Sequence, residues 1–206
     1  MDIQIVYLYI FDTLSDWEPS FAISGINNPA FQQFPGRYII QTAGTSRKPV
    51  KTIGGLTIVP DVTLAEIKPA DSAMLILSGG AGWESGQHDE AVSLAIQFLN
   101  VGKPVAAICG ATAGLAISGI LDNARHTSNA AVYLQATNYQ GGKFFQEKPA
   151  VTDGNLITAN ATAPIEFAYH IFKLLGIYSD KTLQAWYGLY KTGELKYFLE
   201  LSEAGS

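Results

Sequence analysis

Short apolar runs, rich in Val, Ile, Leu and Ala, recur along the chain and end at Gly, Pro, Asn or Asp residues. Runs that stay apolar without alternating polar positions are typical of strands buried on both faces of a sheet. The pattern predicts strands over residues 3–11, 37–43, 72–77, 104–108, 144–151 and 156–159. The last two flank a turn-forming Asp-Gly-Asn at 153–155, and the Gly-Gly pair at 54–55 predicts a β-hairpin over 49–60.

Other segments place their apolar residues on one face of a helix, as the segment between residues 89 and 101 does. The pattern predicts helices over 15–27, 89–101, 129–137, 164–175 and 181–201, and a further helix that Cys109 opens. Thr162 is the expected cap of the helix that begins at Pro164.

Strands that alternate with helices predict an α/β fold with a small β-hairpin. A mostly parallel sheet is covered by helices on both faces and forms the middle layer of a three-layer sandwich. Ligands of such sheets bind beyond the carboxyl ends of the strands. Three groups fall at this edge of the predicted sheet: the turn after Phe11, the Gly79-Gly80 turn, and Cys109.

Length and charge bound the class of protein. A chain of 206 residues is expected to form a single domain, 1–206, in which 181–201 is a C-terminal aromatic helical extension. The formal net charge of −5, without a basic cluster, argues against a nucleic-acid or anionic-membrane partner. No apolar stretch reaches the roughly 18 residues of a membrane span. The start lacks the basic region of a signal peptide, and the tail SEAGS is interpreted as a frayed end.

The chain contains one cysteine. A single thiol forms no internal disulfide, which is typical of a reducing compartment, so we expect a cytoplasmic protein. It also excludes metal sites built from several thiolates. The stretch GGAGWESG lacks the spacing of a dinucleotide fingerprint, and no phosphate-binding loop is present. We therefore predict neither a metal nor a cofactor.

Cys109 stands where an apolar strand runs into a helix, in AAICGATAGLA. This arrangement is typical of a nucleophile elbow, whose tight turn needs small neighbours such as Gly110 and Ala111. A cysteine at a helix N-terminus also feels the positive end of the helix dipole, which favours the thiolate and predicts a lowered pKa. The alternative is a buried structural residue, because free cysteine packs as a small hydrophobe. The local pattern favours the two interpretations about equally.

Two further groups follow buried strands. The Gly79-Gly80 turn offers backbone N–H groups to an oxyanion, although a double glycine is more often an ordinary turn. Glu18 follows the first strand and is placed to face Cys109 from a neighbouring loop. An acid in the first turn of a helix is also explained by the helix dipole alone, and locally that explanation is the stronger one.

A histidine and two tryptophans complete the candidate site. His126, in RHTSN, is a candidate base, although such a residue is more often a solvated loop histidine. Trp17 and Trp83 flank the predicted site and are candidates for the wall of a ligand pocket, since such sites favour aromatic linings. The equally favoured alternative is that each tryptophan packs against residues of its own loop and contacts no ligand.

These motifs resemble the DJ-1/PfpI superfamily, within the wider class I glutamine amidotransferase-like fold. The resemblance covers residues 3–176 and rests on the acid of SDWEPSF, the turn LSGGAGWE, the elbow AAICGATAGLA and the histidine of RHTSN. The elbow is the specific motif, and the others gain weight from their order and spacing. The family implies a flavodoxin-like sandwich that is usually a homodimer.

The resemblance also implies roles. Cys109 would be the nucleophile and oxidation-sensitive thiol, and Glu18 the carboxyl group that hydrogen-bonds its sulfur. The Gly79-Gly80 turn and Gly110 would form the oxyanion hole, with the N–H groups of Gly80 and Gly110 as donors. His126 would be the nearby histidine that shuttles a proton.

The chain departs from two branches of the superfamily. The proteolytic and glyoxalase-like branches carry a histidine directly after the cysteine, where this chain has Gly110. Amidotransferases place a histidine and an acid near the start of the late helix, where this chain has Glu166 with His170 a turn further on. These departures argue against a cysteine–histidine dyad and against glutamine hydrolysis by a triad.

The leading prediction is a cysteine-dependent, hydrolase-like enzyme that acts on a small carbonyl or amide substrate, including a peptide. The second is a non-catalytic redox or stress sensor that uses an oxidisable cysteine. The third is a binding protein that uses the same crevice, or the aromatic C-terminal helix, without chemistry.

Overall fold

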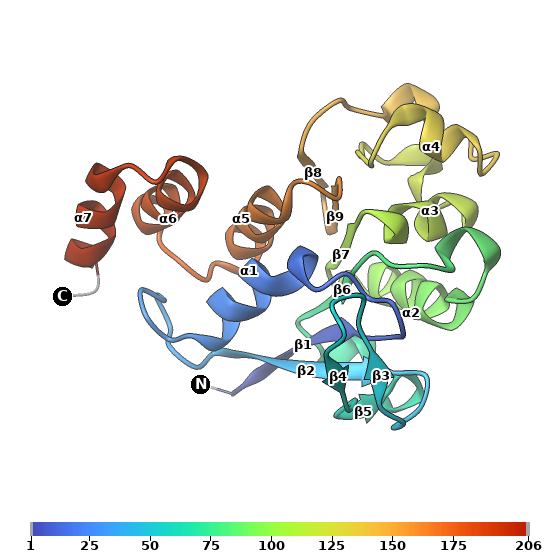
Figure 1. Ribbon diagram of the computed structural model, residues 1–206, viewed down its shortest axis with the longest axis horizontal. Coiled ribbons are helices and arrows are strands. Elements are labelled where there is room, and N and C mark those ends of the chain that lie inside the picture. The colour runs from blue at the N-terminus through green and yellow to red at the C-terminus, as the bar shows by residue number, and fades with distance from the viewer. Residues whose placement is uncertain (1, 205–206) are drawn as a thin grey trace.

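The computed structural model describes residues 2–204, and within them seven strands form one sheet (Figure 1). The order along the sheet is β5 (Val62–Thr63), β2 (Tyr38–Gly44), β1 (Gln4–Tyr9), β6 (Met74–Leu77), β7 (Val105–Ile108), β9 (Leu156–Ala159) and β8 (Ala150–Asp153). Neighbouring strands are parallel, except that β8 runs antiparallel to β9. The separate hairpin pairs β3 (Val50–Lys51) with β4 (Thr57–Ile58).

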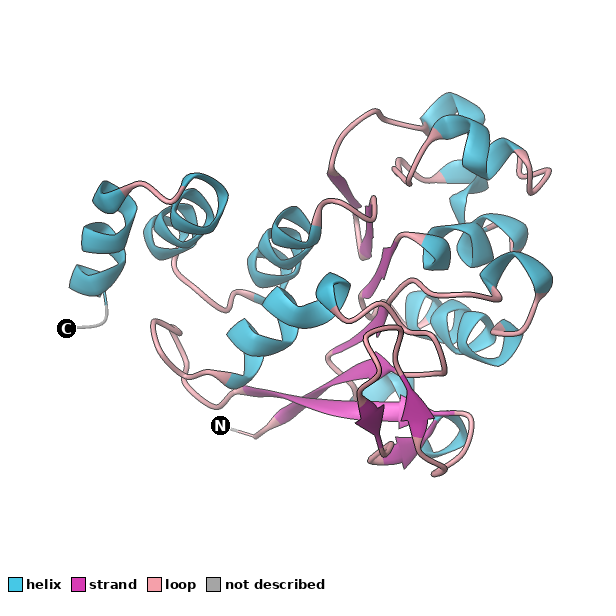
Figure 2. Cartoon of the chain, viewed as in Figure 1, coloured by secondary structure: helices cyan, strands magenta, loops and turns pink. Residues whose placement is uncertain are grey.

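Helices flank this sheet (Figure 2). The α-helices are α1 (Trp17–Asn27), α2 (Asp89–Asn100), α3 (Gly110–Ile117), α4 (Ala131–Gln135), α5 (Pro164–Leu175), α6 (Asp180–Thr192) and α7 (Leu195–Ala204). Short 3₁₀ turns are η1 (Leu64–Glu66), η2 (Pro69–Asp71), η3 (Trp83–Ser85), η4 (Ile120–Asn123) and η5 (Gly142–Phe144). Helices α1 and α5 pack together, while α2 packs on β6 and β7 and contacts α3. The predicted flavodoxin-like α/β sandwich with a small hairpin is confirmed.

The central strands explain why the sequence shows apolar runs without alternation. Every residue of β6 and β7 is buried, because helices cover both faces of the sheet. Burying each of their Val, Leu, Ile and Met side chains stabilises the fold by about 1.5–3 kcal/mol. These two strands end at the Gly79-Gly80 turn and at Cys109, so the most rigid part of the core supports the candidate site.

Two predicted elements are shorter in the structure. Of the strand predicted over 144–151, only residues 150–151 lie in a strand, β8, which continues to Asp153 and pairs only along the length of the four-residue β9. Phe145 makes an isolated bridge with His126 instead. The helix predicted over 129–137 shrinks to α4, since Asn129 lies before it and uses its side chain to bind other segments.

The C-terminal region also differs from its prediction. The helix predicted over 181–201 is two helices, α6 and α7, because Gly193 ends α6 in the left-handed conformation (φ 70°). Gly188 of α6 leaves room for the ring of Tyr197, which a Cβ would approach to 2.5 Å. Of the tail SEAGS, residues 202–204 belong to α7, and residues 205–206 lie outside the described part of the chain.

The cap predicted for α5 is likewise wrong. Ala163 occupies the N-cap position of this helix and makes no side-chain cap. The Thr162 hydroxyl donates instead to Asn160 Oδ1, at 2.8 Å. The side chain of Thr162 therefore stabilises the loop after β9 and leaves the helix start uncapped.

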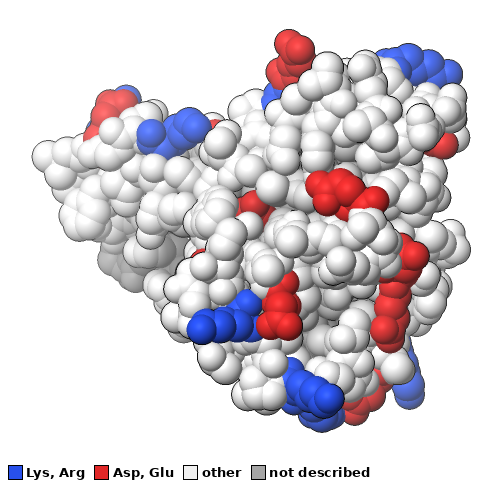
Figure 3. Space-filling view, turned by 45° about the vertical axis from the view of Figure 1, so that its right-hand side comes forward, with Lys and Arg blue, Asp and Glu red and all other residues white. Residues whose placement is uncertain are grey.

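The charged side chains of the surface and the length of the helices bear on the class of protein. On the face shown in Figure 3, acidic and basic side chains lie in small separate groups within a largely uncharged surface. Among residues 2–204, no helix has both the length and the apolar character that crossing a bilayer requires.

Candidate active site

Loops from the carboxyl ends of neighbouring strands converge on the sulfur of Cys109. Glu18 comes from the start of α1, which follows β1, and the Gly79-Gly80 turn follows β6. Cys109 and Gly110 follow β7, which pairs with β6 on one side and with β9 on the other. The structure thus brings together the predicted cysteine, carboxyl group and glycine turn at the sheet edge where parallel α/β proteins bind ligands.

Cys109 lies on a strained turn between β7 and α3. Its backbone has φ 59° and ψ −125°, a conformation that costs a non-glycine residue about 1–3 kcal/mol. The surroundings enforce it: Cys109 N donates to Ala159 O at 3.0 Å, and the Thr112 hydroxyl donates to Cys109 O at 2.6 Å. The side chain is only partly buried, so filling the core does not account for it.

Glu18 lies beneath the sulfur and is fully buried. Its Oε2 accepts hydrogen bonds from Gly79 N at 2.5 Å and from Ser78 Oγ at 3.1 Å, and the carboxyl group lies beside the Cys109 thiol. Gly79 stands between the two groups. A Cβ at Gly79 would lie 2.8 Å from Glu18 Oε2 and 2.9 Å from Cys109 Sγ, so only glycine fits there.

The acid–base state of this pair differs from the prediction. Burial raises the pKa of Glu18, against several hydrogen bonds that lower it. Burial, followed by the charge of Glu18, raises the pKa of Cys109 to about 11, whereas the helix N-terminus led us to expect a lowered value. Asn129 and the Gly110 N–H lower the pKa of Cys109, but no cation is among the causes that would offset the carboxylate. At neutral pH the resting sulfur therefore holds its proton, with Glu18 as the neighbouring acceptor.

Two backbone donors remain for a developing negative charge. The Gly110 N–H faces the sulfur, and within residues 2–204 no hydrogen bond engages the N–H of Gly80. A Cβ at Gly80 would lie 2.5 Å from the ring of Phe11, which explains the glycine. Gly79 was predicted to belong to the oxyanion hole, but its N–H is committed to Glu18. Of the predicted oxyanion donors, the N–H groups of Gly80 and Gly110 are those that no hydrogen bond to Glu18 occupies.

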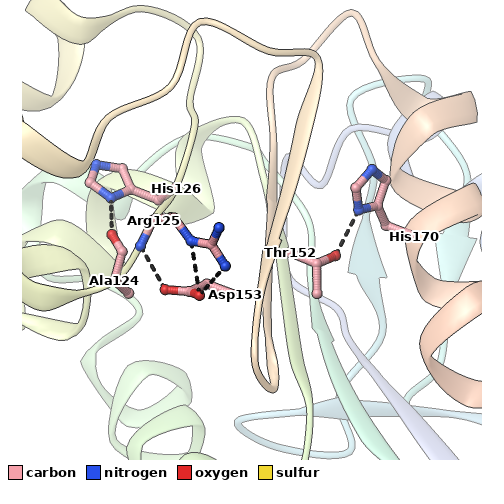
Figure 4. A network of polar contacts seen from close by, with 6 residues as sticks. All are labelled: Ala124, Arg125, His126, Thr152, Asp153 and His170. Carbon is pink, nitrogen blue, oxygen red and sulfur yellow. Dashed lines mark hydrogen bonds and ion pairs between the residues drawn. The ribbon is translucent and has the colours of Figure 1, made fainter.

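His126 does not lie at the sulfur. It is fully buried, and its Nδ1 is bonded to Ala124 O at 2.7 Å (Figure 4). Its Nε2 is bonded to the Tyr139 hydroxyl at 3.2 Å. Both ring nitrogens are occupied, and burial lowers the pKa of the ring. The prediction that His126 stands beside the nucleophile as a proton shuttle therefore needs correction.

Asn129, three residues further on, occupies the place predicted for a histidine. Its Nδ2 donates to Cys109 Sγ at 3.5 Å, and its Oδ1 accepts from Ala161 N at 2.9 Å. Asn129 was not among the predicted site residues, because the local pattern places it in a helix. The only signal was the polar stretch Thr-Ser-Asn after Arg-His, which does not distinguish a site residue from a turn.

The segment that carries Asn129 is firmly anchored. Arg125 binds Asp153 through its side chain and its backbone N–H, and Figure 4 shows this pair beside His126. Thr127 N donates to Thr158 Oγ1 on β9, at 2.9 Å. Ser128 Oγ lies 2.6 Å from Thr112 Oγ1, which holds the Cys109 carbonyl. These bonds place Asn129 against the sulfur.

The two tryptophans have different environments. Trp83 was predicted to line a pocket but is buried, packs against Gly110 and Gly114, and donates to Ser78 O at 3.1 Å. Trp17 is half exposed, and its indole N–H donates to Ala161 O at 3.2 Å. With Ile53 and Leu56 it lines a surface groove of about 610 Å³. Of the two, Trp17 alone is available to a ligand.

The remaining titratable candidates serve other contacts. His170 of α5 bonds Thr152 Oγ1 at 2.6 Å (Figure 4), and His88 bonds Tyr9 and Ala81. Glu166 forms an ion pair with Lys191 of α6 at 2.6 Å. Within the described part of the chain, none of the three histidines contacts Cys109. The same residues hold no cluster of three or more His, Cys, Asp or Glu side chains suited to a metal ion.

A hydrogen-bonded tyrosine and glutamate, Tyr133 and Glu84, also lie near Cys109. The Tyr133 hydroxyl of α4 donates to the Glu84 carboxylate of η3. Burial and then Glu84 raise the pKa of Tyr133, and the charges of Cys109 and Glu18 contribute in the same direction. The sulfur is therefore surrounded by a nucleophile elbow, a buried acid, an amide and acidic rim groups, which defines an α/β protein with a cysteine-centred site.

Comparison with known proteins identifies the family. The model of the DJ-1/PfpI family matches residues 4–174. The chain is 40% identical over 204 residues to the "Uncharacterized protease YoaZ" of Bacillus subtilis, covering 98% of this chain and 97% of that protein. A crystal structure of a ThiJ/PfpI family protein from Bacillus anthracis superposes with a TM-score of 0.92 at 37% identity, covering 99% of each chain. A more distant relative, "Deglycase PH1704" of Pyrococcus horikoshii, is 29% identical over 112 residues, which cover 54% of this chain and 66% of that protein.

The chain therefore belongs to the DJ-1/PfpI family, as the motifs predicted. The family assignment and the structure agree on the fold. They leave the substrate open, because one close relative is named a protease and a distant one a deglycase.

Proposed function

We propose that this protein is a cysteine-dependent, hydrolase-like enzyme whose Cys109 adds to the carbonyl carbon of a small substrate. The observation that carries the proposal is the strained, partly exposed Cys109 close to the buried Glu18 and beside the Gly110 N–H. A structural cysteine needs neither a strained backbone nor a buried carboxyl partner.

In the proposed step the thiol proton moves from Sγ to the Glu18 carboxylate as the S–C bond forms. The electron pair of the carbonyl π bond moves to oxygen, where the N–H groups of Gly80 and Gly110 stabilise it. The Asn129 amide donates to the sulfur while it carries negative charge. Glu18, whose pKa burial raises, is then able to return the proton to the substrate oxygen or to a leaving group.

This arrangement favours a carbonyl compound over an amide. Carbonyl addition requires one proton transfer, from sulfur to oxygen through Glu18. Expulsion of an amine requires Glu18 to deliver its proton to the leaving nitrogen, and hydrolysis of the thioester that remains requires a further proton transfer from water. Within residues 2–204 no histidine contacts the sulfur to share these steps. The name of the deglycase relative supports carbonyl chemistry, and the name of the protease relative supports only the broader hydrolase class.

A redox sensor is the second candidate. The observation in its favour is the ring of donors around a partly exposed sulfur: the Asn129 amide and the Gly110 N–H would hydrogen-bond the oxygens of a sulfinate. Two-electron oxidation by a peroxide to the sulfenate, and again to the sulfinate, supplies those oxygens and releases water. The raised pKa of Cys109 argues for slow oxidation, so turnover is the stronger proposal.

The test compares wild type with Cys109→Ala on a panel of α-oxoaldehydes, small amides and peptides, with Thr162→Ala as a surface control. We expect thiol-dependent turnover of carbonyl compounds, its loss in Cys109→Ala, and no change in the control. Equal activity of wild type and Cys109→Ala would overturn the proposal. Absence of any turnover, with clean gain of two oxygens at Cys109 under mild peroxide, would favour the sensor.

Assembly and location remain proposals that rest on the family resemblance and on composition. We propose a homodimer in the cytoplasm, acting on a small-molecule or peptide substrate, and the single cysteine supports a reducing compartment. Sedimentation equilibrium at micromolar concentration tests the dimer directly.

A further inference from the structure

His88 lies under the oxyanion loop and takes no part in the step proposed above. It is buried, with Nε2 2.8 Å from Ala81 O and Nδ1 3.0 Å from the Tyr9 hydroxyl. Its ring packs against those of Phe11 and Trp83, at centroid distances of 4.2 and 4.4 Å. A buried, fully bonded histidine below a functional loop calls for an explanation.

The two bonds define the tautomer of His88. Ala81 O is a carbonyl and only accepts, so Nε2 must carry the proton and donate it. Nδ1 is then the acceptor for the Tyr9 hydroxyl. Burial lowers the pKa of the ring, against Ala81, Asp89 and Glu84, which raise it, so the neutral form is the one that these contacts fit.

The hydrogen bonds of the loop account for nearly every polar group in it. Gly79 N donates to Glu18 and Gly79 O accepts from Ser15 N, while Ala81 N donates to Thr13 Oγ1. Ala81 O is held by His88. Ser15 and Thr13 therefore hold the peptide groups on the two sides of Gly80, and His88 holds the peptide group that follows them. The Gly80 N–H is the donor that these bonds leave free.

We propose that His88, held in one tautomer by Tyr9, is a positioning residue that aims the Gly80 N–H at the oxyanion. The proposal rests on the proposed function. The Ala81 carbonyl lies in the Ala81–Gly82 peptide group, so releasing it frees that peptide and removes one of the three bonds, with those of Ser15 and Thr13, that hold the turn around Gly80. A preorganised donor loses most of its value when it is free to turn, because stabilisation of the oxyanion depends on fixed dipoles.

The experiment uses a matched pair of substitutions. In His88→Gln the side-chain amide reaches the position of Nε2 and still donates to Ala81 O. In His88→Asn the shorter amide reaches only the position of Nδ1. We expect kcat on the carbonyl substrate to fall about 100-fold in His88→Asn, within the range for loss of one oxyanion donor, and less than threefold in His88→Gln. Tyr9→Phe should fall between them.

Alkylation of Cys109 by iodoacetamide separates positioning from a merely structural role. Displacement of iodide by sulfur creates no oxyanion, so its rate should change less than twofold in all three variants. His170→Asn, the same change at a histidine that bonds Thr152, is the control and should leave both rates unaltered. Equal kcat in His88→Asn and His88→Gln, or parallel loss of turnover and alkylation, would overturn the proposal.

A second measurement needs no substrate. In ¹⁵N-labelled protein, the amide resonances of Gly80 and Ala81 should shift in His88→Asn and stay near their wild-type positions in His88→Gln. Unshifted resonances in both variants overturn the positioning role. If wild type turns over no substrate but these resonances shift as expected, the proposed function fails while the support of the loop by His88 stands.

Discussion

Two loops reach the sulfur, and each is supported by a buried histidine with the same kind of partners. His88 bonds the Ala81 carbonyl and the Tyr9 hydroxyl, and His126 bonds the Ala124 carbonyl and the Tyr139 hydroxyl. The first supports the Gly79-Gly80 turn, and the second lies in the segment that carries Asn129. In both loops the histidine supports the backbone, and a different residue faces Cys109. The chemical groups are Glu18 and an amide, which distinguishes this site from one built on a cysteine–histidine dyad.

The largest expected effect comes from Glu18, which bonds the first loop. Glu18→Gln keeps the size of the side chain and removes the proton acceptor, so kcat should fall by about 10²–10⁴. The same change removes the charge that raises the pKa of Cys109, so the midpoint of its alkylation should move below the value of about 11. Iodoacetamide rates against pH measure the shift. An unchanged or raised midpoint would contradict the pairing of the two groups.

The second-largest loss of turnover is expected for substitution of Gly80, which lies in the same loop. In Gly80→Ala the new Cβ meets Phe11 and Thr13 O, so the turn must move and one donor is lost. We expect about a 10²–10³-fold loss in kcat with little change in the pKa of Cys109. Gly82→Ala, in the same loop but beyond Ala81, is the control for general strain. Equal losses in the two variants would show that the loop responds as a whole and not through the Gly80 N–H.

Substitution of Asn129 tests the contribution of the second loop to the reactivity of Cys109. Asn129→Leu removes the donor to Sγ, and because this bond lowers the pKa of Cys109, the alkylation midpoint should rise. Turnover should fall about tenfold, less than for Glu18, because an uncharged donor at 3.5 Å contributes a weaker interaction. Asn129→Asp is the matched variant and should raise the midpoint further, by adding a negative charge. A lowered midpoint in either variant would remove Asn129 from the site.

The smallest effect on chemistry is expected at His126. His126→Gln should leave kcat within about threefold and reduce stability by about 1–3 kcal/mol, since a buried hydrogen-bonded ring is lost. Burial lowers the pKa of His126, so its native contribution is present above the unfolded value of about 6.5 and is lost as the pH falls through the folded value. Urea unfolding at pH 7 and pH 5 should show a smaller acid-induced loss in His126→Gln than in wild type.

If kcat falls as far in His126→Gln as in Glu18→Gln, the two buried histidines do not share a supporting role. His126 would then act as the proton shuttle. Iodoacetamide alkylation of the same variant distinguishes the cases. A supporting role leaves the rate at Cys109 unchanged, whereas a catalytic base changes its dependence on pH.

The elements that the sequence predicted well are those decided by local patterns. The strands β1, β6 and β7 are continuous apolar runs because both faces of the sheet are covered, and that pattern is visible without any partner. The elbow at Cys109 is visible because the turn and its close packing require small residues at fixed places along the chain. Glu18 and the Gly79-Gly80 turn followed from their positions at the carboxyl ends of strands, although locally each had an ordinary explanation.

The roles of His126, Asn129 and Trp83 depend on contacts that no local pattern records. Residues 126–129 lie outside the helices and the main sheet, and their side chains have different partners: His126 bonds Ala124 O, whereas Asn129 bonds Cys109 Sγ. Which side chain meets the sulfur depends on how Arg125 and Thr127 bind β8 and β9, strands that lie more than twenty residues away. Trp83 likewise turned inward because Gly110 and Gly114 leave space for its ring.

The sequence by itself determined the α/β sandwich, the family and the position of the candidate nucleophile, since periodicity, small residues and motif order are properties of neighbouring positions. Only the tertiary structure decided the environment of the sulfur. The raised pKa of Cys109, the amide in place of a histidine, and the free N–H of Gly80 all arise where loops from different strands meet. Burial and hydrogen bonding there are set by residues far apart in the chain.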